Sequence, residues 1–317
     1  MTHDPPGITH RNQGCVYREQ LGPQAGGQSL LAYLSRRYPH SSAEQWAANV
    51  SAGLVLLDGM AASVDARLQA GMELLWLRPA WVEPAAPRWF DLVYEDDDLL
   101  AVAKPGGLPT LPGANFYQST LLHLVQQQWS EAVPLHRLGR WTSGLVLCAK
   151  TPAARRGLLR QWSTRQVGKR YRALASGLPV WDESVVDTPI GPVTHPLLGT
   201  LHAASSRGKP ACSAVTVLER RAGCFLCDVA IDTGRPHQIR IHLASVGYPL
   251  LGDPLYRNGG LPDPDSAVLP GDPGYLLHSA ELRFQHPANG QSMRIDCPPP
   301  PVLCTAQESL ALETALR

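Results

Sequence analysis

The chain has 317 residues, of which 44% are hydrophobic and 17% are charged, and its formal net charge at pH 7 is +1. A chain of this length and composition can bury a sizeable core, which excludes wholesale disorder. No apolar run reaches the roughly eighteen residues that a membrane-spanning helix needs, so we expect no membrane partner. Seven scattered cysteines, behind a polar start without a signal-peptide pattern, predict reduced thiols in the cytoplasm.

The first third of the chain is predicted to contain a small module behind an irregular arm. The arm covers residues 1–28 and includes one possible short strand, CVYREQL. The module covers residues 29–83, where LLAYLSRRY has helical spacing and Ser42 with Gln45 forms a capping-box pattern for a second helix. GLVLLDG and GMELLWL follow as two short strands, which makes the module ααβ. A Pro-rich linker is expected at residues 84–90.

The rest of the chain alternates short β-rich runs with turn signals. Helical spacing is found chiefly in STLLHLVQQQW and in a basic segment, and QIRIHLA near residue 240 is expected to be a strand. Because regular βαβ repeats are absent, residues 91–300 predict an α+β domain on a mixed or antiparallel sheet. Residues 301–317 are expected to form a C-terminal helix.

The basic segment is a stretch in which cations gather without any acid. Residues 151–172 have a net charge of +7. Such a concentration indicates a surface for a polyanion. A solvated helix face is the equally open alternative, and Leu158 and Leu159 are available to pack such a helix. The cations are Arg155, Arg156, Arg160, Arg165, Lys169, Arg170 and Arg172.

Metal and cofactor sites are not expected. Cys224 and Cys227 have metal-binding spacing, but no second cysteine or histidine pair completes four ligands. The segment CFLCDVAI reads as a strand, in which residues three apart face opposite sides. Glycine-rich nucleotide signatures are absent as well, so we expect no nucleotide cofactor.

Five segments together resemble the RluA-type RNA pseudouridine synthases. YEDDDLLAVAKPGGLPTLPG is similar to the opening motif of that family, HRLGRWTSGLVLCAK to its catalytic motif, and KRYRALASG to the segment with its active-site tyrosine. TGRPHQIRIHLASVGYPLLGDPLY and LHSAELRFQHPANG are similar to its last two motifs. Residues 29–83 resemble the S4-type RNA-binding module that often precedes this catalytic domain.

The resemblance implies a uridine-to-pseudouridine isomerisation in structured RNA, either rRNA or tRNA, without cofactor or metal. The target base must leave its stack and enter a pocket. Tyr171 would supply an aromatic surface and a candidate base for the C5 proton, and Arg235 would pair with the catalytic carboxylate. Contacts to RNA are expected from His136, Arg137, Arg140, Arg155, Arg156, Arg160, Lys169 and His237.

The sequence departs from the family at the residue that should attack the sugar. Relatives read HRLD, whereas this chain reads HRLG with Gly139 at the aspartate position, a form that we associate with a subgroup of the family. Asp232 is the candidate for a substitute carboxylate. Asp253 is a weaker one, because an aspartate in a turn-like stretch usually bonds its own turn.

Two functions remain open from the sequence. One is an active RNA pseudouridine synthase, and the other is a catalytically silent RNA-binding protein or RNA chaperone on the same fold. Tritium release from 5-tritiated uridine separates them, because only an enzyme exchanges that proton. The module at residues 29–83 has four arginines against five acids, which favours a positioning role over RNA affinity.

Overall fold

The computed structural model describes residues 9–315, which fall into two compact units, Thr9–Glu83 and a larger unit from Pro84 onward. The first eight residues of the expected arm and the last two of the expected C-terminal helix lie outside the described residues. Between residues 9 and 315 no helix is long and apolar enough to cross a membrane.

The smaller unit packs two helices against a four-stranded sheet. Its second helix begins with the predicted capping box, in which the Ser42 side chain accepts from the Gln45 amide and the Gln45 side chain accepts from the Ser42 amide. The sheet order is β2-β5-β3-β4, so the strand expected within the arm is present and belongs to this sheet. The bounds are β1 His10–Arg11, β2 Cys15–Gln20, η1 Pro23–Ala25, α1 Leu30–Arg37, α2 Ala43–Ser51, β3 Val55–Leu57, β4 Met60–Ala61, β5 Glu73–Arg78 and β6 Val82–Glu83.

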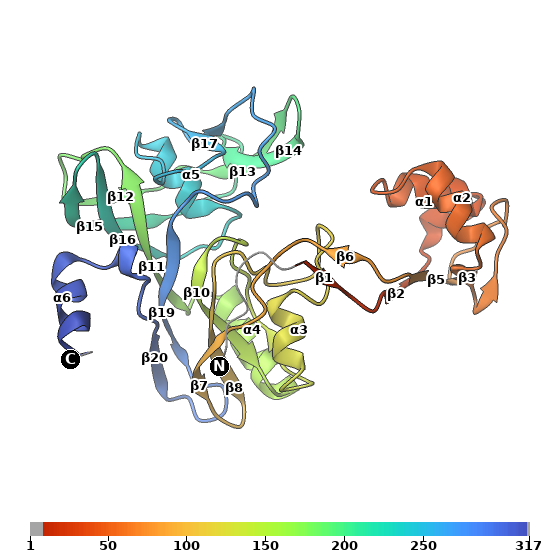
Figure 1. Ribbon diagram of the computed structural model, residues 1–317, viewed down its shortest axis with the longest axis horizontal. Helices are drawn as coiled ribbons and strands as arrows, with labels where there is room; N and C mark the ends of the chain where they lie inside the picture. The colour runs from red at the N-terminus through yellow and green to blue at the C-terminus, as the bar shows by residue number, and fades with distance from the viewer. Residues whose placement is uncertain (1–8, 316–317) are drawn as a thin grey trace. The chain divides into compact units, whose positions relative to one another are not determined.

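The larger unit is built on a ten-stranded sheet, which runs through its centre in Figure 1. The main order is β12-β15-β16-β11-β19-β10-β8-β7, with β20 beside β19 and β9 beside β10. Only the β10–β19 pair among these is parallel, which confirms the predicted α+β class with a mixed, mainly antiparallel sheet. The strands are β7 Asp91–Glu95, β8 Leu99–Lys104, β9 Val133–Pro134, β10 Ser143–Ala149, β11 Gly168–Ser176, β12 Glu183–Val186, β15 Ser213–Arg221, β16 Cys224–Ile231, β19 Leu277–Gln285 and β20 Ser292–Asp296.

Helices and two hairpins complete this unit. Figure 1 shows α5 beside the β13–β14 hairpin and β17, in agreement with its contacts. The elements are α3 Leu121–Gln126, α4 Pro152–Ser163, β13 Ile190–His195, β14 Gly199–Ala204, α5 Gln238–Ser245, β17 Tyr256–Arg257, β18 Leu261–Pro262, η2 Pro301–Leu303 and α6 Ala306–Ala315.

The strand predicted at QIRIHLA is wrong, because this segment is helix α5. Seven of its eight residues are buried, so the helix lacks a polar face and shows no helical periodicity in the sequence. The alternation of Ile239, Ile241 and Leu243 imitated a strand pattern. Arg240 is therefore a buried residue of a helix and not a residue of a strand.

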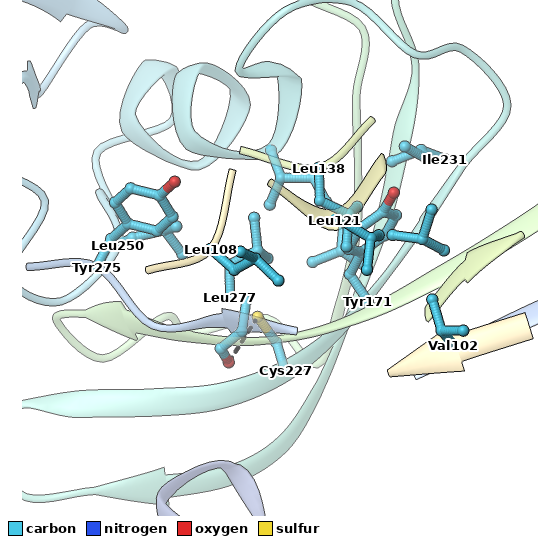
Figure 2. Close-up of a cluster of buried hydrophobic side chains, with 14 of the residues drawn as sticks. Val102, Leu108, Leu121, Leu138, Tyr171, Cys227, Ile231, Leu250, Tyr275 and Leu277 are labelled. Carbon is cyan, nitrogen blue, oxygen red and sulfur yellow. Dashed lines mark hydrogen bonds between the residues drawn. The ribbon is translucent and has the colours of Figure 1, made fainter. Parts of the chain in front are cut away.

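One apolar cluster of the larger unit contains Leu138, Tyr171 and Tyr275. Figure 2 shows Tyr171 and Tyr275 on either side of Leu108 and Leu277, with both hydroxyls directed toward the side on which Leu138 lies. Leu138 is buried and precedes Gly139 in the chain. The HRLG loop, residues 136–139, is therefore anchored in the core by Leu138, the residue just before the glycine.

Candidate active site

A cavity opens beside Gly139 where four segments of the larger unit meet. It has a volume of about 130 Å³ and lies between the HRLG loop, strand β11, the N-terminal end of α5 and the start of β19. A second cavity of about 570 Å³ shares Arg137, Gly139 and His237 with it. Lining residues of the first cavity include Arg137, Gly139, Thr142, Tyr171, Arg235, His237, Gln238, Arg240 and Tyr275.

Gly139 is exposed at this cavity, and a tyrosine hydroxyl fills the space beside it. Its carbonyl accepts from the Thr142 amide at 3.0 Å, which closes a tight turn. A Cβ atom added to Gly139 would lie 2.9 Å from the Tyr275 hydroxyl oxygen and 3.3 Å from Thr142 Oγ1. The first distance is shorter than ordinary contacts of a Cβ atom, so a side chain at residue 139 and the Tyr275 hydroxyl compete for one volume.

The buried cation of the cavity is Arg240. Its side chain is only 2% exposed, and it donates from Nε and Nη2 to the two carboxylate oxygens of Asp253 at 2.6 and 2.8 Å. Nη1 donates to the Pro270 carbonyl at 2.7 Å, and the guanidinium lies 4.2 Å from the centre of the Tyr275 ring. Every part of this guanidinium therefore has a partner inside the protein.

Arg235 also lines the cavity, but it is half-buried and differently bonded. Its Nε donates to the Pro210 carbonyl at 3.2 Å, and its amide donates to the Gln238 side chain. The carboxylate that pairs with a cavity arginine is thus held by Arg240 and not by Arg235.

Neither candidate substitute carboxylate reaches Gly139. Asp232 follows the last residue of β16, is exposed, and is not among the residues that line the cavity. Asp253 is buried, and its Oδ1 also accepts from the amides of Leu255 and Tyr256 at 2.9 and 3.1 Å. Asp253 therefore bonds its own turn, as aspartates in such turns commonly do, and binds Arg240 as well.

Tyr171 comes to the cavity from strand β11, with its ring in the apolar cluster. It is 8% exposed, and burial raises the pKa of its phenol to about 12. The hydroxyl is therefore neutral at physiological pH, and the ring offers an aromatic surface at the cavity wall.

A buried lysine connects the HRLG loop to the end of strand β8. Lys104 is 1% exposed, and its Nζ donates to the carbonyls of Pro105, Leu108 and Arg140 at 2.8 to 3.0 Å. The Gly107 amide also donates to the Arg140 carbonyl at 2.8 Å. Lys104 thus ties the backbone of residues 105–108 to that of Arg140, the residue after Gly139.

The Arg140 side chain bonds backbone carbonyls of the protein. Its Nε donates to the Gly107 carbonyl at 3.0 Å and its Nη2 to the Ala85 carbonyl at 3.0 Å. Its guanidinium lies 4.7 Å from the centre of the Phe116 ring, and the residue lines the larger cavity. Arg137, in contrast, is exposed and lines both cavities.

The two histidines expected to contact RNA have different surroundings. His136 accepts from the Leu147 amide at 3.1 Å and stacks on Trp162 at 5.1 Å, and it lines neither cavity. His237 lines both and has a left-handed backbone, with φ at 54° just before α5. Its Nδ1 is 2.7 Å from the Tyr256 hydroxyl, and burial lowers its pKa to about 3, so its ring is neutral.

The basic segment is placed away from these cavities. Arg155, Arg156 and Arg160 are exposed on α4, whereas Lys169 is half-buried on β11. Arg172 is 8% exposed and paired with Asp228 and Glu308, so its charge does not contribute to a free basic surface. The structure thus brings Arg137, Tyr171, Arg235 and His237 together, and leaves the α4 arginines as a separate surface.

No group of three or more histidine, cysteine or acidic residues within residues 9–315 is arranged to hold a metal ion. All seven cysteines are free thiols. Cys224 and Cys227 are buried on the predicted strand, β16.

Two site residues were missed by sequence reasoning. Arg240 carried a signal, since an arginine between Ile239 and Ile241 in a buried segment requires an acidic partner. Tyr275 carried none, because it follows a long Pro- and Gly-rich loop whose path only the fold decides.

Several proteins to which this chain is similar are described as pseudouridine synthases. A family model described as RNA pseudouridylate synthase matches residues 98–245. An uncharacterized RNA pseudouridine synthase of Synechocystis sp. is 41% identical over 288 residues, which cover 90% of this chain and 99% of the relative. RNA pseudouridine synthase 5 of Arabidopsis thaliana is 36% identical, with 94% and 96% covered. Ribosomal large subunit pseudouridine synthase D of Neisseria meningitidis serogroup B is 33% identical, with 92% and 81% covered.

The fold agrees with these relatives. The structure of human RNA pseudouridylate synthase domain containing 1 matches with a TM-score of 0.53 at 22% identity, covering 73% of this chain and 96% of that one. This likeness establishes the pseudouridine synthase fold. Because the sequence relatives extend over nearly the whole chain, the protein belongs to the RNA pseudouridine synthase family.

Proposed function

We propose that the protein is an RluA-type RNA pseudouridine synthase that isomerises a uridine in rRNA or tRNA, with Gly139 at the position of the usual aspartate. The observation that carries this proposal is the cavity that joins Arg137, Tyr171 and Arg240 beside the HRLG loop. An enzyme of this class needs a phosphate-binding cation and an aromatic wall for a flipped base, and Arg137 and Tyr171 match those needs. Arg240 adds a cation to the cavity wall, where the buried Asp253 holds it in place.

The chemistry proceeds in three steps on one nucleotide. The base leaves its stack and enters the cavity against Tyr171, while Arg137 holds the backbone phosphate. The C1′–N1 bond then breaks, the uracil turns, and C5 bonds to C1′. Loss of the C5 proton completes the isomerisation, and the neutral phenol of Tyr171 is positioned to relay that proton.

Substrate RNA would lie across a larger surface than the cavity alone. The second cavity leads from Gly139 past Phe116 and Arg140 to the loop at Pro270, and its size suits a flanking nucleotide. The exposed arginines of α4 would add phosphate contacts that depend on salt. Residues 29–83 would act as an S4-like positioning module, since four arginines against five acids disfavour strong RNA binding.

Tritium release from RNA transcribed with 5-tritiated uridine tests the function. DNA that encodes the rRNAs and tRNAs serves as template for the transcripts, and Tyr171→Ala is the paired inactive control. We expect release by the natural protein and a loss of at least about 100-fold in the variant. RNA binding without tritium release from any transcript would instead identify a silent RNA-binding protein on this fold.

A further inference from the structure

The cavity contains no carboxylate among its lining residues within the described part of the chain. Oxygen-bearing side chains at its wall are those of Thr142, Tyr171, Gln238 and Tyr275. Gln238 is occupied, because its Oε1 accepts from Thr233 and from the Arg235 amide while its Nε2 donates to Cys212 and Ser213. The other side-chain oxygens at the cavity wall therefore belong to hydroxyl groups.

Among these hydroxyls, that of Tyr275 occupies the place of the missing side chain. It lies 2.9 Å from where the Cβ of a larger residue 139 would stand. Its oxygen lies 3.5 Å from Thr142 Oγ1, which is at the limit of a hydrogen bond. The hydroxyl is thus buried at the cavity wall and nearly free to bond a ligand.

The surroundings of Tyr275 hold this hydroxyl in position. The residue is 4% exposed, and the guanidinium of Arg240 lies 4.2 Å from the ring centre. Because both oxygens of Asp253 are bonded to Arg240, that carboxylate cannot turn toward the cavity without breaking a buried ion pair. Phenols are more acidic than the aliphatic alcohol of Thr142 and form more stable anions, so Tyr275 is the better nucleophile of the two.

We propose that Tyr275 is a catalytic residue and that its hydroxyl oxygen, instead of a carboxylate at residue 139, attacks the ribose C1′ of the target uridine. This inference rests on the proposed function. A tyrosine oxygen serves as nucleophile in one class of glycosidases, which cleave a similar bond at an electron-poor sugar carbon.

The step balances without a co-reactant. The Tyr275 oxygen bonds to C1′ as the C1′–N1 bond breaks, and the phenol proton passes to the departing uracil at N1. After the base turns, C5 bonds to C1′ and the tyrosine oxygen leaves with the bonding electron pair. The C5 proton returns to that oxygen through Tyr171, which restores both phenols.

Removal of one oxygen atom tests the assignment. Tyr275→Phe keeps the ring beside Arg240, and Tyr94→Phe removes a hydroxyl that hydrogen-bonds Asp96 and lines neither cavity. We expect kcat for tritium release to fall at least about 100-fold in Tyr275→Phe, with RNA affinity and Tm unchanged, and to stay within about twofold in Tyr94→Phe. A purely structural role would instead lower Tm or weaken RNA binding.

A second pair of variants tests whether the two positions exchange one role. Gly139→Asp alone forces its Cβ against the Tyr275 hydroxyl, so we expect it to fall below the natural protein in activity. Gly139→Asp combined with Tyr275→Phe removes the clashing oxygen and supplies a carboxylate in its place. We expect this double variant to exceed Tyr275→Phe alone by at least about tenfold.

The outcomes separate this inference from the function on which it rests. Release by the natural protein with full activity in Tyr275→Phe overturns the role of Tyr275 and leaves the synthase function standing. A double variant no more active than Tyr275→Phe overturns the exchange of roles with residue 139. No release by the natural protein overturns the synthase function and, with it, the assignment of Tyr275.

Discussion

Arg240 and Asp253 form a buried two-point ion pair at the base of the cavity, with N–O distances of 2.6 and 2.8 Å. The two side chains are 2% and 1% exposed. Such a pair fixes α5 relative to the turn at Leu255, and the start of α5 lines the site. The pair therefore positions α5 and also contributes to the stability of the fold.

Asp253→Asn is expected to lower the free energy of unfolding by about 3–5 kcal/mol, because it leaves a buried guanidinium without a counter-charge. Urea unfolding at pH 7 measures this loss. Asp182→Asn is the matched control, since Asp182 pairs with Arg220 while 82% exposed and should cost less than about 1 kcal/mol. Equal losses in the two variants would show that the buried pair contributes no more than a surface pair.

Lys104→Met is expected to destabilise the protein by about 2–4 kcal/mol, because three backbone carbonyls lose their common donor in a buried place. The loop that carries Gly139 would then lose its support, so tritium release should fall as well. Lys150→Met is the control, since that lysine bonds Glu95 and the Asp96 carbonyl at the surface. Thermal unfolding that is unchanged in Lys104→Met would contradict the support role.

His136 is predicted to make stability depend on pH. Burial lowers the pKa of its imidazole to about 4 from an unfolded value of 6.5, so the unfolded chain binds the extra proton between these two values. The free energy of unfolding should therefore be highest above pH 6.5 and decline as the pH falls toward 4. His136→Gln keeps an acceptor for the Leu147 amide but does not titrate.

The test compares the two proteins by urea unfolding at pH 7 and pH 5. The stability difference between natural protein and His136→Gln should shrink at pH 5, because only the natural protein must keep a buried ring neutral against protonation. Parallel pH dependences would show that His136 protonates without cost in the folded state.

Arg155, Arg156 and Arg160 are predicted to bind RNA phosphates from the exposed face of α4. Replacing all three by alanine should weaken RNA binding and flatten the plot of log K against log salt concentration by about 0.7–0.9 for every phosphate that is no longer neutralised. Filter binding across a salt series measures the slope. A variant of equal charge change, with alanine at the exposed Arg207, Arg220 and Arg294, is the control, and an identical slope change in both would disprove a specific α4 surface.

The sequence by itself determined the family, the class of fold and most of the local structure. Motifs such as HRLG and TGRPHQIR are continuous in the chain, so their residues can be recognised without knowledge of the fold. Capping at Ser42 and the strand around Cys224 are likewise local, because side-chain alternation and backbone bonding act over a few residues. The absence of a side chain at Gly139 also needed only the sequence.

Tertiary structure decided which groups meet. Helix α5 imitated a strand because it is buried on nearly all sides, so no polar face marked its periodicity. The buried cation of the site is Arg240 and not the expected Arg235. Its partner is Asp253, which lies thirteen residues further along the chain. Tyr275 reaches Gly139 over more than 130 residues, and no local pattern encodes such a contact, since it depends on how strands β10 and β19 pair.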